Sequence, residues 1–355
     1  MITVEQRAIG RDNNFNLLRM IAATVVLVSH AWPLTMGMHA IEPLYTLTGY
    51  KLGTTAVSVF FAISGFFITK SFANRASIGD FVLARVARIY PGLIAVLLLT
   101  MLVLGPIFTT LPLGVYFSDI HTWAYVPVNL TLKKMMWGLP GVFAGNPYGH
   151  AINGSLWTLY WEVCCYGLVV VAGLIGLSRP AFMPLILAVA IGATFLVPQA
   201  EAGSLLRSAA TLSLPFAIGA AVYVYRRWVP VSGLLVLLLF GLAAFAFGTI
   251  LYPMMHAFAV AYAALWLGFA DIPGIKAYNR FGDFSYGMYI YAFPVEQAMM
   301  ALFHDMKSWP LILASFPLTL LLAIASWTWI ESPALNHRHI LVARLRLRRK
   351  RQDSH

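Results

Sequence analysis

Charged side chains inside apolar runs are the first candidates for chemistry in this chain. Arg19 and His30 fall in one such run, eleven positions apart. At 3.6 residues per turn, this spacing places both on one helical face, roughly 16 Å apart along the axis. Ionisable groups in an apolar span are costly and usually functional, so the pair predicts a polar column. Taken singly, a snorkelling arginine and an interhelical histidine hydrogen bond are the simpler interpretations.

Two further patterns have spacing that suits a site. Arg85 and Arg88 are three residues apart before an apolar run, so they share a helical side and can bind phosphate. The alternative is that basic residues simply flank a membrane span. Ser155 and Glu162 are seven residues apart in another run and share a face. Glu162 and Glu296 both lie in apolar runs, and a carboxylate there needs a partner.

Aromatic residues accompany these polar groups. Trp157 lies between Ser155 and Glu162, and its spacing is typical of packing or of an interfacial belt. Tyr289 belongs to a helical stripe with Tyr286 and Phe293. On spacing alone, that stripe favours a packed core over a site.

Transmembrane helices are the elements expected to position these residues. Hydrophobic residues make up 60% of the 355 residues and charged residues 10%, against roughly half and a quarter in soluble domains. The sequence therefore predicts an all-α polytopic transmembrane helix bundle with about ten spans. We expect the spans at 15–33, 54–72, 89–108, 155–177, 182–197, 209–225, 234–252, 255–270, 284–303 and 311–330.

The distribution of positive charge orients the predicted bundle. With the N-terminus inside, 19 of the 24 Lys and Arg residues fall on the inner side, so both termini are expected in the cytoplasm. Residues 1–336 form the predicted transmembrane domain and 337–355 a basic cytoplasmic tail. Such a tail favours contact with anionic lipid headgroups over nucleic acid. No histidine pair has metal-ligand spacing within a span, so we expect no metal site.

Several motifs, in this order, resemble the acyltransferase-3 family of bacterial membrane O-acyltransferases. They are Arg19 and His30 with ten residues between them, VSVFFAISGFFI at 57–68, Arg85 and Arg88 before Tyr90-Pro91, GSLWTLYWE ending in Glu162, FGDFSYGMYIYAFPVEQ at 281–297, and Glu331-Ser332-Pro333. The resemblance covers the chain from Asn13 to about Asn336.

The resemblance implies transfer of an acyl group, usually acetyl, from cytoplasmic acyl-CoA to a glycan or glycolipid hydroxyl at the outer face of the bacterial inner membrane. It implies acyl-CoA as donor substrate and no permanently bound cofactor. Arg19, Arg85 and Arg88 are then expected to bind the CoA phosphates. His30 is the expected general base, and Glu162 orients its imidazole or binds the acceptor. Three further residues are expected to contact substrate: Ser155, Trp157 and Tyr289.

Two other classes of protein fit part of the pattern. Buried Arg, His and Glu also build proton relays in secondary transporters, although we find no internal repeat of the kind many transporters show. A membrane scaffold without catalysis leaves the aligned Arg19 and His30 unexplained. Among acceptors, lipid-linked sugars, lipopolysaccharide, exopolysaccharide, peptidoglycan and glycosylated metabolites all fit the resemblance.

Overall fold

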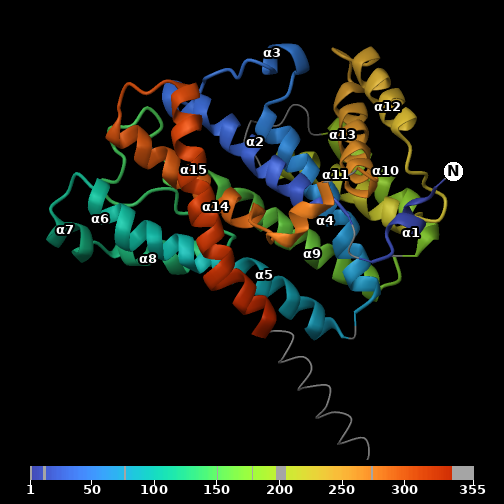
Figure 1. Ribbon diagram of the computed structural model, residues 1–355, viewed down its shortest axis with the longest axis horizontal. Coiled ribbons are helices and arrows are strands. Elements are labelled where there is room, and N and C mark those ends of the chain that lie inside the picture. The colour runs from blue at the N-terminus through green and yellow to red at the C-terminus, as the bar shows by residue number, and fades with distance from the viewer. Residues whose placement is uncertain are drawn as a thin grey trace, which may run out of the picture. The chain divides into compact units, whose positions relative to one another are not determined.

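Helices account for the regular structure in the described part of the chain (Figure 1). The computed structural model describes residues 2–10, 13–75, 77–149, 151–177, 179–196, 205–272 and 275–337. The α-helices are α1 Val4–Arg7, α2 Phe15–Met36, α3 Tyr45–Thr48, α4 Leu52–Ala73, α5 Ile78–Leu99, α6 Gly105–Phe108, α7 Leu113–Ser118, α8 Ile120–Leu130, α9 Trp157–Leu174, α10 Met183–Leu196, α11 Leu205–Val224, α12 Gly233–Phe245, α13 Tyr252–Phe269, α14 Ser285–Leu302 and α15 Ser308–Ser326. The predicted basic tail lies outside the described residues from position 338 onward.

Short helical turns of other types connect or extend these helices. Two are π-helical, and π-helical turns occur often at functional sites. The turns are η1 Thr100–Leu104 (π), η2 Gly154–Leu156 (3-10), η3 Pro180–Phe182 (3-10), η4 Ile275–Arg280 (3-10) and η5 Trp327–Glu331 (π).

The prediction of a membrane helix bundle is confirmed. Among the described residues, six helical segments are long and apolar enough to cross a bilayer: Phe15–Met36, Leu52–Ala73, Ile78–Phe108, Gly154–Leu174, Leu205–Val224 and Ser308–His337. Two predicted spans are shorter helices, α10 with 14 residues and α12 with 13. At 1.5 Å per residue each rises roughly 20 Å, less than a hydrocarbon core of about 30 Å. The number of spans and the placement of the termini stay predictions.

Two helix boundaries differ from the expected spans by more than five residues. The helix expected from 89 begins at Ile78, because the Ser77 hydroxyl accepts a hydrogen bond from the Asp80 amide and caps it. Arg85 and Arg88 therefore lie within α5. The span expected at 234–252 ends at Phe245 and is followed by Gly248 with φ +78°. The segment 109–154, which lies between two expected spans, contains the helices α7 and α8.

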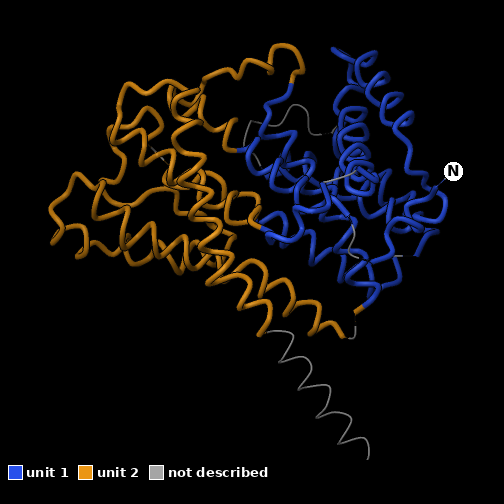
Figure 2. Tube along the Cα trace, viewed as in Figure 1, with its two compact units in different colours: residues 1–26, 50–74, 159–283 blue, residues 27–49, 75–158, 284–355 orange. Residues whose placement is uncertain are grey.

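The chain forms two compact units, each assembled from separate stretches (Figure 2). Unit 1 comprises residues 1–26, 50–74 and 159–283, and unit 2 comprises 27–49, 75–158 and 284–355. Unit 1 therefore contains α1, α4, α10 to α13 and most of α9. Unit 2 contains α3, α5 to α8, α14 and α15. Helix α2 passes from unit 1 into unit 2 between Val26 and Leu27.

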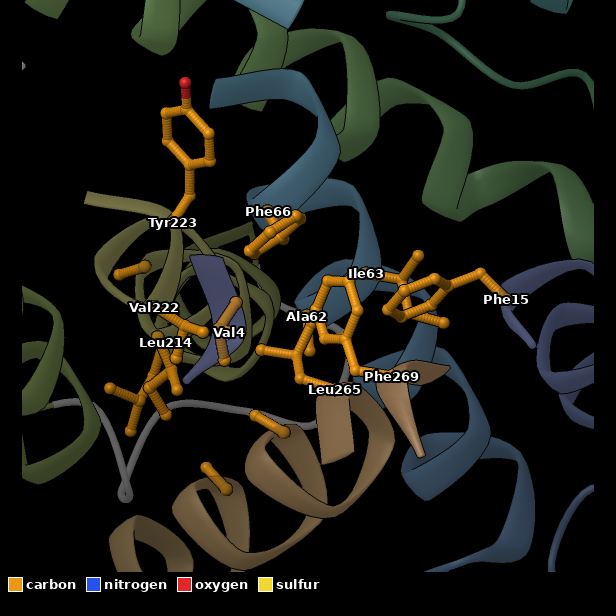
Figure 3. Close-up of a cluster of buried hydrophobic side chains, with 14 of the residues drawn as sticks. Val4, Phe15, Ala62, Ile63, Phe66, Leu214, Val222, Tyr223, Leu265 and Phe269 are labelled. Atoms are coloured by element: carbon orange, nitrogen blue, oxygen red, sulfur yellow. The ribbon is translucent and has the colours of Figure 1, made fainter. Parts of the chain in front are cut away.

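Unit 1 is built around a cluster of buried apolar side chains from α2, α4, α11 and α13 (Figure 3). The Phe269 ring lies 4.9 Å from that of Phe15 and 5.2 Å from that of Phe66. Helices α4 and α11 cross with their backbones almost in contact. A Cβ on Gly65 would lie 2.0 Å from the Phe216 carbonyl oxygen, so only glycine fits at this crossing.

We expect Gly65→Ala to destabilise the protein by about 1–3 kcal/mol, because the added methyl group must push α4 and α11 apart. Thermal unfolding of the purified protein in nanodiscs measures this. Gly241→Ala is the matched control. Gly241 lies in α12 with nothing within 4 Å of its Cβ position, and alanine is the better helix former. Equal melting temperatures for the two variants would contradict the close crossing.

Unit 2 brings α14 against α15 and α5. A Cβ on Gly287 of α14 would lie 2.7 Å from the Ala323 Cα of α15. The Tyr286 hydroxyl donates a 2.8 Å hydrogen bond to the Ile89 carbonyl of α5, and its ring covers Gly92. These contacts hold α14 in place against α15 and α5.

Candidate active site

His30 faces a buried carboxylate from another helix. Its Nδ1 lies 3.8 Å from Oε2 of Glu296 on α14, and both residues belong to unit 2. The Glu296 side chain is fully buried. Within the described residues, neither His30 Nδ1 nor either Glu296 carboxylate oxygen has a hydrogen-bond partner. A carboxylate beside Nδ1 can orient an imidazole and stabilise the cation formed when the ring takes up a proton.

The aromatic ring of Phe293 forms a wall beside the His30 imidazole. The two ring centroids are 5.0 Å apart in an edge-to-face arrangement. Phe293 is three residues before Glu296, so one face of α14 supplies both the wall and the carboxylate. A Cβ on Gly154 would lie 2.6 Å from the Phe293 ring. Glycine at that position therefore lets η2, the turn that leads into α9, approach the ring.

Two predicted substrate residues lie where η2 leads into α9: Ser155 is buried and Trp157 is partly exposed. Asn153 caps this end, because its Oδ1 accepts a hydrogen bond from the Ser155 amide while its Nδ2 donates to the Ile290 carbonyl on α14. The Ser155 hydroxyl is buried, and no described residue hydrogen-bonds to it. An orphaned buried hydroxyl costs free energy unless a ligand satisfies it. Trp157 is 36% exposed.

Tyr289, the third predicted substrate residue, is tied to the same region. Its hydroxyl lies 2.6 Å from Thr158 Oγ1 at the beginning of α9. The Tyr289 side chain is buried, and the other members of its stripe also pack within unit 2.

Arg88 is part of a second polar cluster in unit 2. Its Nη1 lies 3.9 Å from Oε2 of Glu331, which is buried in the π-helical turn η5. The guanidinium also lies over the rings of Tyr286 and Trp327, at 5.8 and 5.9 Å from their centroids. Ser326 donates a 2.8 Å hydrogen bond to the other Glu331 oxygen. Arg88 thus neutralises a buried carboxylate at the end of the last long helix.

Arg85 lies one turn earlier on α5 in a different environment. Its guanidinium is 5.8 Å from the centroid of the Phe81 ring and the side chain is partly buried. Arg85 and Arg88 follow each other on one side of α5, as their spacing predicted.

Arg19 and Glu162 belong to unit 1. Arg19 Nη1 lies 3.6 Å from Asp283 Oδ2, and the guanidinium is 5.5 Å from the centroid of the Phe67 ring. Glu162 accepts a hydrogen bond from the Tyr166 hydroxyl, one turn later on α9. The carboxylate that the structure places beside His30 is Glu296. The predicted roles of Arg19 and Glu162 therefore rest on the sequence pattern.

Sequence reasoning missed three functional candidates. Glu296 was flagged as a carboxylate in need of a partner, but nothing linked it to His30. Asp283 lies within the motif at 281–297, without a pattern pointing to Arg19. Glu331 ends the last apolar run, and its distance to Arg88 gives it a role. Among the described residues, no group of three or more His, Cys, Asp and Glu side chains is placed to hold a metal ion.

Comparison with known proteins adds a functional class to this geometry. A family model described as an acyltransferase domain matches residues 12–328. An "O-acetyl transferase" of Shigella phage Sf6 is 32% identical over 335 residues, which cover 90% of this chain and 95% of that protein. "Nodulation protein 10" of Rhizobium leguminosarum bv. viciae is 34% identical over 167 residues, covering 44% of this chain and 43% of that protein. No solved structure matches.

Proposed function

The chain belongs to the acyltransferase-3 family, and we propose that it transfers an acetyl group from acetyl-CoA to a hydroxyl of a cell-envelope glycan or glycolipid. The observation that carries the proposal is the buried pair of His30 and Glu296 within the matched region. An imidazole with a carboxylate at Nδ1 has the arrangement of a general base for a hydroxyl nucleophile.

In the proposed reaction, Glu296 faces Nδ1 of His30, so Nε2 is the nitrogen that receives the proton. It removes the proton of the acceptor hydroxyl as that oxygen attacks the thioester carbonyl. The new ester C–O bond forms, the C–S bond breaks, and the proton passes to the thiolate of CoA. The orphaned Ser155 hydroxyl supports a substrate contact near this base, because Phe293 touches both His30 and the adjoining Gly154.

We propose that the donor and the acceptor bind from opposite faces of the bacterial inner membrane. Arg85 and Arg88, with Arg19, are proposed to bind the phosphates of acyl-CoA on the cytoplasmic side, since guanidinium groups pair with phosphate. Trp157 and Tyr289 are proposed substrate contacts with Ser155. Glu162 is proposed to bind the acceptor, because Glu296 already faces the imidazole nitrogen that an orienting carboxylate would occupy.

Family membership favours this transferase over a secondary transporter, which the same buried Arg, His and Glu also allow. The test is acetyl transfer by purified protein in nanodiscs, with radiolabelled acetyl-CoA and glycolipid extracted from the envelope of the bacterium that carries the gene. We expect label in the extracted acceptor, and loss of the same acetyl ester from envelope glycans when the gene is deleted, by mass spectrometry. Solute flux in proteoliposomes without any acetyl transfer would overturn the proposal in favour of transport.

A further inference from the structure

A fully buried amide joins α14 to the loop before α9. Gln297 Nε2 donates hydrogen bonds of 2.6 Å to the carbonyl oxygens of Tyr148 and Ala151. Its Oε1 accepts a 2.7 Å hydrogen bond from Asn146 Nδ2, which also lies 2.9 Å from the Gln297 carbonyl oxygen. Both donors of the Gln297 amide and its acceptor are thus used. We call these four residues, Asn146, Tyr148, Ala151 and Gln297, the amide clasp.

The clasp continues the face of α14 that surrounds His30. Phe293, Glu296 and Gln297 stand at i, i+3 and i+4, so they share one side of the helix. The first two face the imidazole and the third holds the loop. A glutamine with no exposed surface is costly in this apolar setting unless it is fully hydrogen-bonded. The loop is therefore fixed at one position along α14.

An aromatic contact connects the clasp to the imidazole. The Tyr148 ring packs edge-to-face on Phe293 with centroids 5.8 Å apart, and Phe293 packs in turn on His30 at 5.0 Å. Gly154 packs against the Phe293 ring from another direction. The ring of Phe293 is held between the loop and the imidazole, so releasing Tyr148 removes one of its supports. The His30 imidazole then loses the ring contact with Phe293 that keeps it beside Glu296.

We propose that Gln297 is a positioning residue for acyl transfer, which sets the orientation of His30 through Tyr148 and Phe293. The inference rests on the proposed function, since it takes His30 as the base. Small displacements of a base reduce the rate steeply, and a misplacement of about 1 Å can cost roughly 100-fold. The phosphates of acetyl-CoA are proposed to bind at Arg19, Arg85 and Arg88, away from the clasp, so acetyl-CoA affinity is expected to change little when the clasp is opened.

The test compares Gln297→Met with a matched control. The methionine side chain has nearly the same volume and removes all three side-chain hydrogen bonds. The control is Asn129→Leu, also in unit 2. Asn129 is buried and likewise makes three side-chain hydrogen bonds, to the Tyr125 carbonyl and to the carbonyl and amide of Met136. Both variants lose a comparable buried amide, but nothing in the described contacts connects Asn129 to Phe293.

Three measurements are made on folded protein in nanodiscs. Transfer from acetyl-CoA to glycolipid of the host envelope gives kcat and KM, calorimetry gives acetyl-CoA affinity, and ¹⁵N-histidine NMR reports the His30 imidazole, assigned with His30→Ala. Gln297→Met should lower kcat roughly 10- to 100-fold, leave acetyl-CoA affinity within twofold, and shift the His30 resonances. Asn129→Leu should melt at a similarly reduced temperature with normal kcat and unshifted His30 resonances.

A milder variant keeps the inference testable if Gln297→Met does not fold. Asn146→Leu leaves both Nε2 bonds of Gln297 in place, so we expect a smaller shift of the same His30 resonances and a smaller loss of kcat. Unshifted resonances and normal kcat in a folded clasp variant would overturn the positioning role. Failure of the proposed function is distinguishable, because His30→Ala would then transfer normally while the resonance shift in Gln297→Met would persist.

Discussion

His30→Ala is expected to yield a folded protein that still binds acetyl-CoA but transfers the acetyl group roughly 10²- to 10⁴-fold more slowly, the usual contribution of a positioned base. The physical reason is the arrangement in unit 2, where Glu296 faces Nδ1 of His30 and leaves Nε2 for the acceptor proton. Transfer is measured per folded molecule, with melting temperature and acetyl-CoA affinity determined on the same preparation.

Glu296→Gln refines this result. The amide keeps the size of the side chain but carries no charge to stabilise the imidazolium, so we expect a smaller loss of transfer than for His30→Ala. Glu162→Gln is the companion variant. If Glu162 binds the acceptor, this variant should raise the acceptor concentration needed for half-maximal transfer.

A purely structural role for His30 predicts the opposite outcome for His30→Ala, with destabilisation by about 0.6 kcal/mol, the average for an interhelical hydrogen bond, and normal turnover. Near wild-type transfer in well-folded His30→Ala protein would rule out the base.

Arg88→Ala is expected to destabilise the protein by about 3–5 kcal/mol, because it removes the cation that lies 3.9 Å from the buried Glu331 carboxylate. The guanidinium also lies over the rings of Tyr286 and Trp327, so its removal opens space between α5 and η5. Thermal unfolding in nanodiscs measures the loss. Adding Glu331→Gln to Arg88→Ala should restore part of the stability, since the neutral amide needs no cation.

Arg85→Ala is the companion variant to Arg88→Ala, one turn earlier on the same helix. Both variants should weaken acetyl-CoA binding by about 1–3 kcal/mol, the range for a hydrogen bond to a charged group. Arg88→Ala should also lower the melting temperature strongly, because it removes the contact with Glu331. A wild-type melting temperature for Arg88→Ala would show that its pair with Glu331 contributes nothing to folding. Unchanged acetyl-CoA affinity in both would remove them from the donor site.

Much of this protein follows from local sequence. Apolar runs of about 20 residues can only be covered by lipid or by one another, so the helical membrane bundle was predictable from composition and run length. The ordered motifs from Arg19 to Glu331 identified the family, which the match over residues 12–328 confirms. Helix α2 carries Arg19 and His30 within one continuous helix, as their spacing predicted.

Helix ends were less predictable than helices. The sequence suggested a span beginning at 89, but the cap at Ser77 extends α5 backward by three turns. The expected span at 234–252 ends at Phe245, with Gly248 in the left-handed region soon after. These boundaries depend on individual capping and turn residues, whose effect is small beside the average hydropathy of a run.

The partners of the buried polar groups were decided by the tertiary structure. Sequence spacing determines which side of a helix a residue occupies, but not which other helix packs against that side. Glu162 was expected to orient the His30 imidazole or to bind the acceptor, and packing of α14 brings Glu296 to the imidazole and Gln297 to Tyr148 and Ala151. Glu331 and Arg88 meet for the same reason. The sequence determined the types of ionisable group inside the bundle, and helix packing decided which of them pair, because contacts between residues far apart in the chain depend on how whole helix faces fit together.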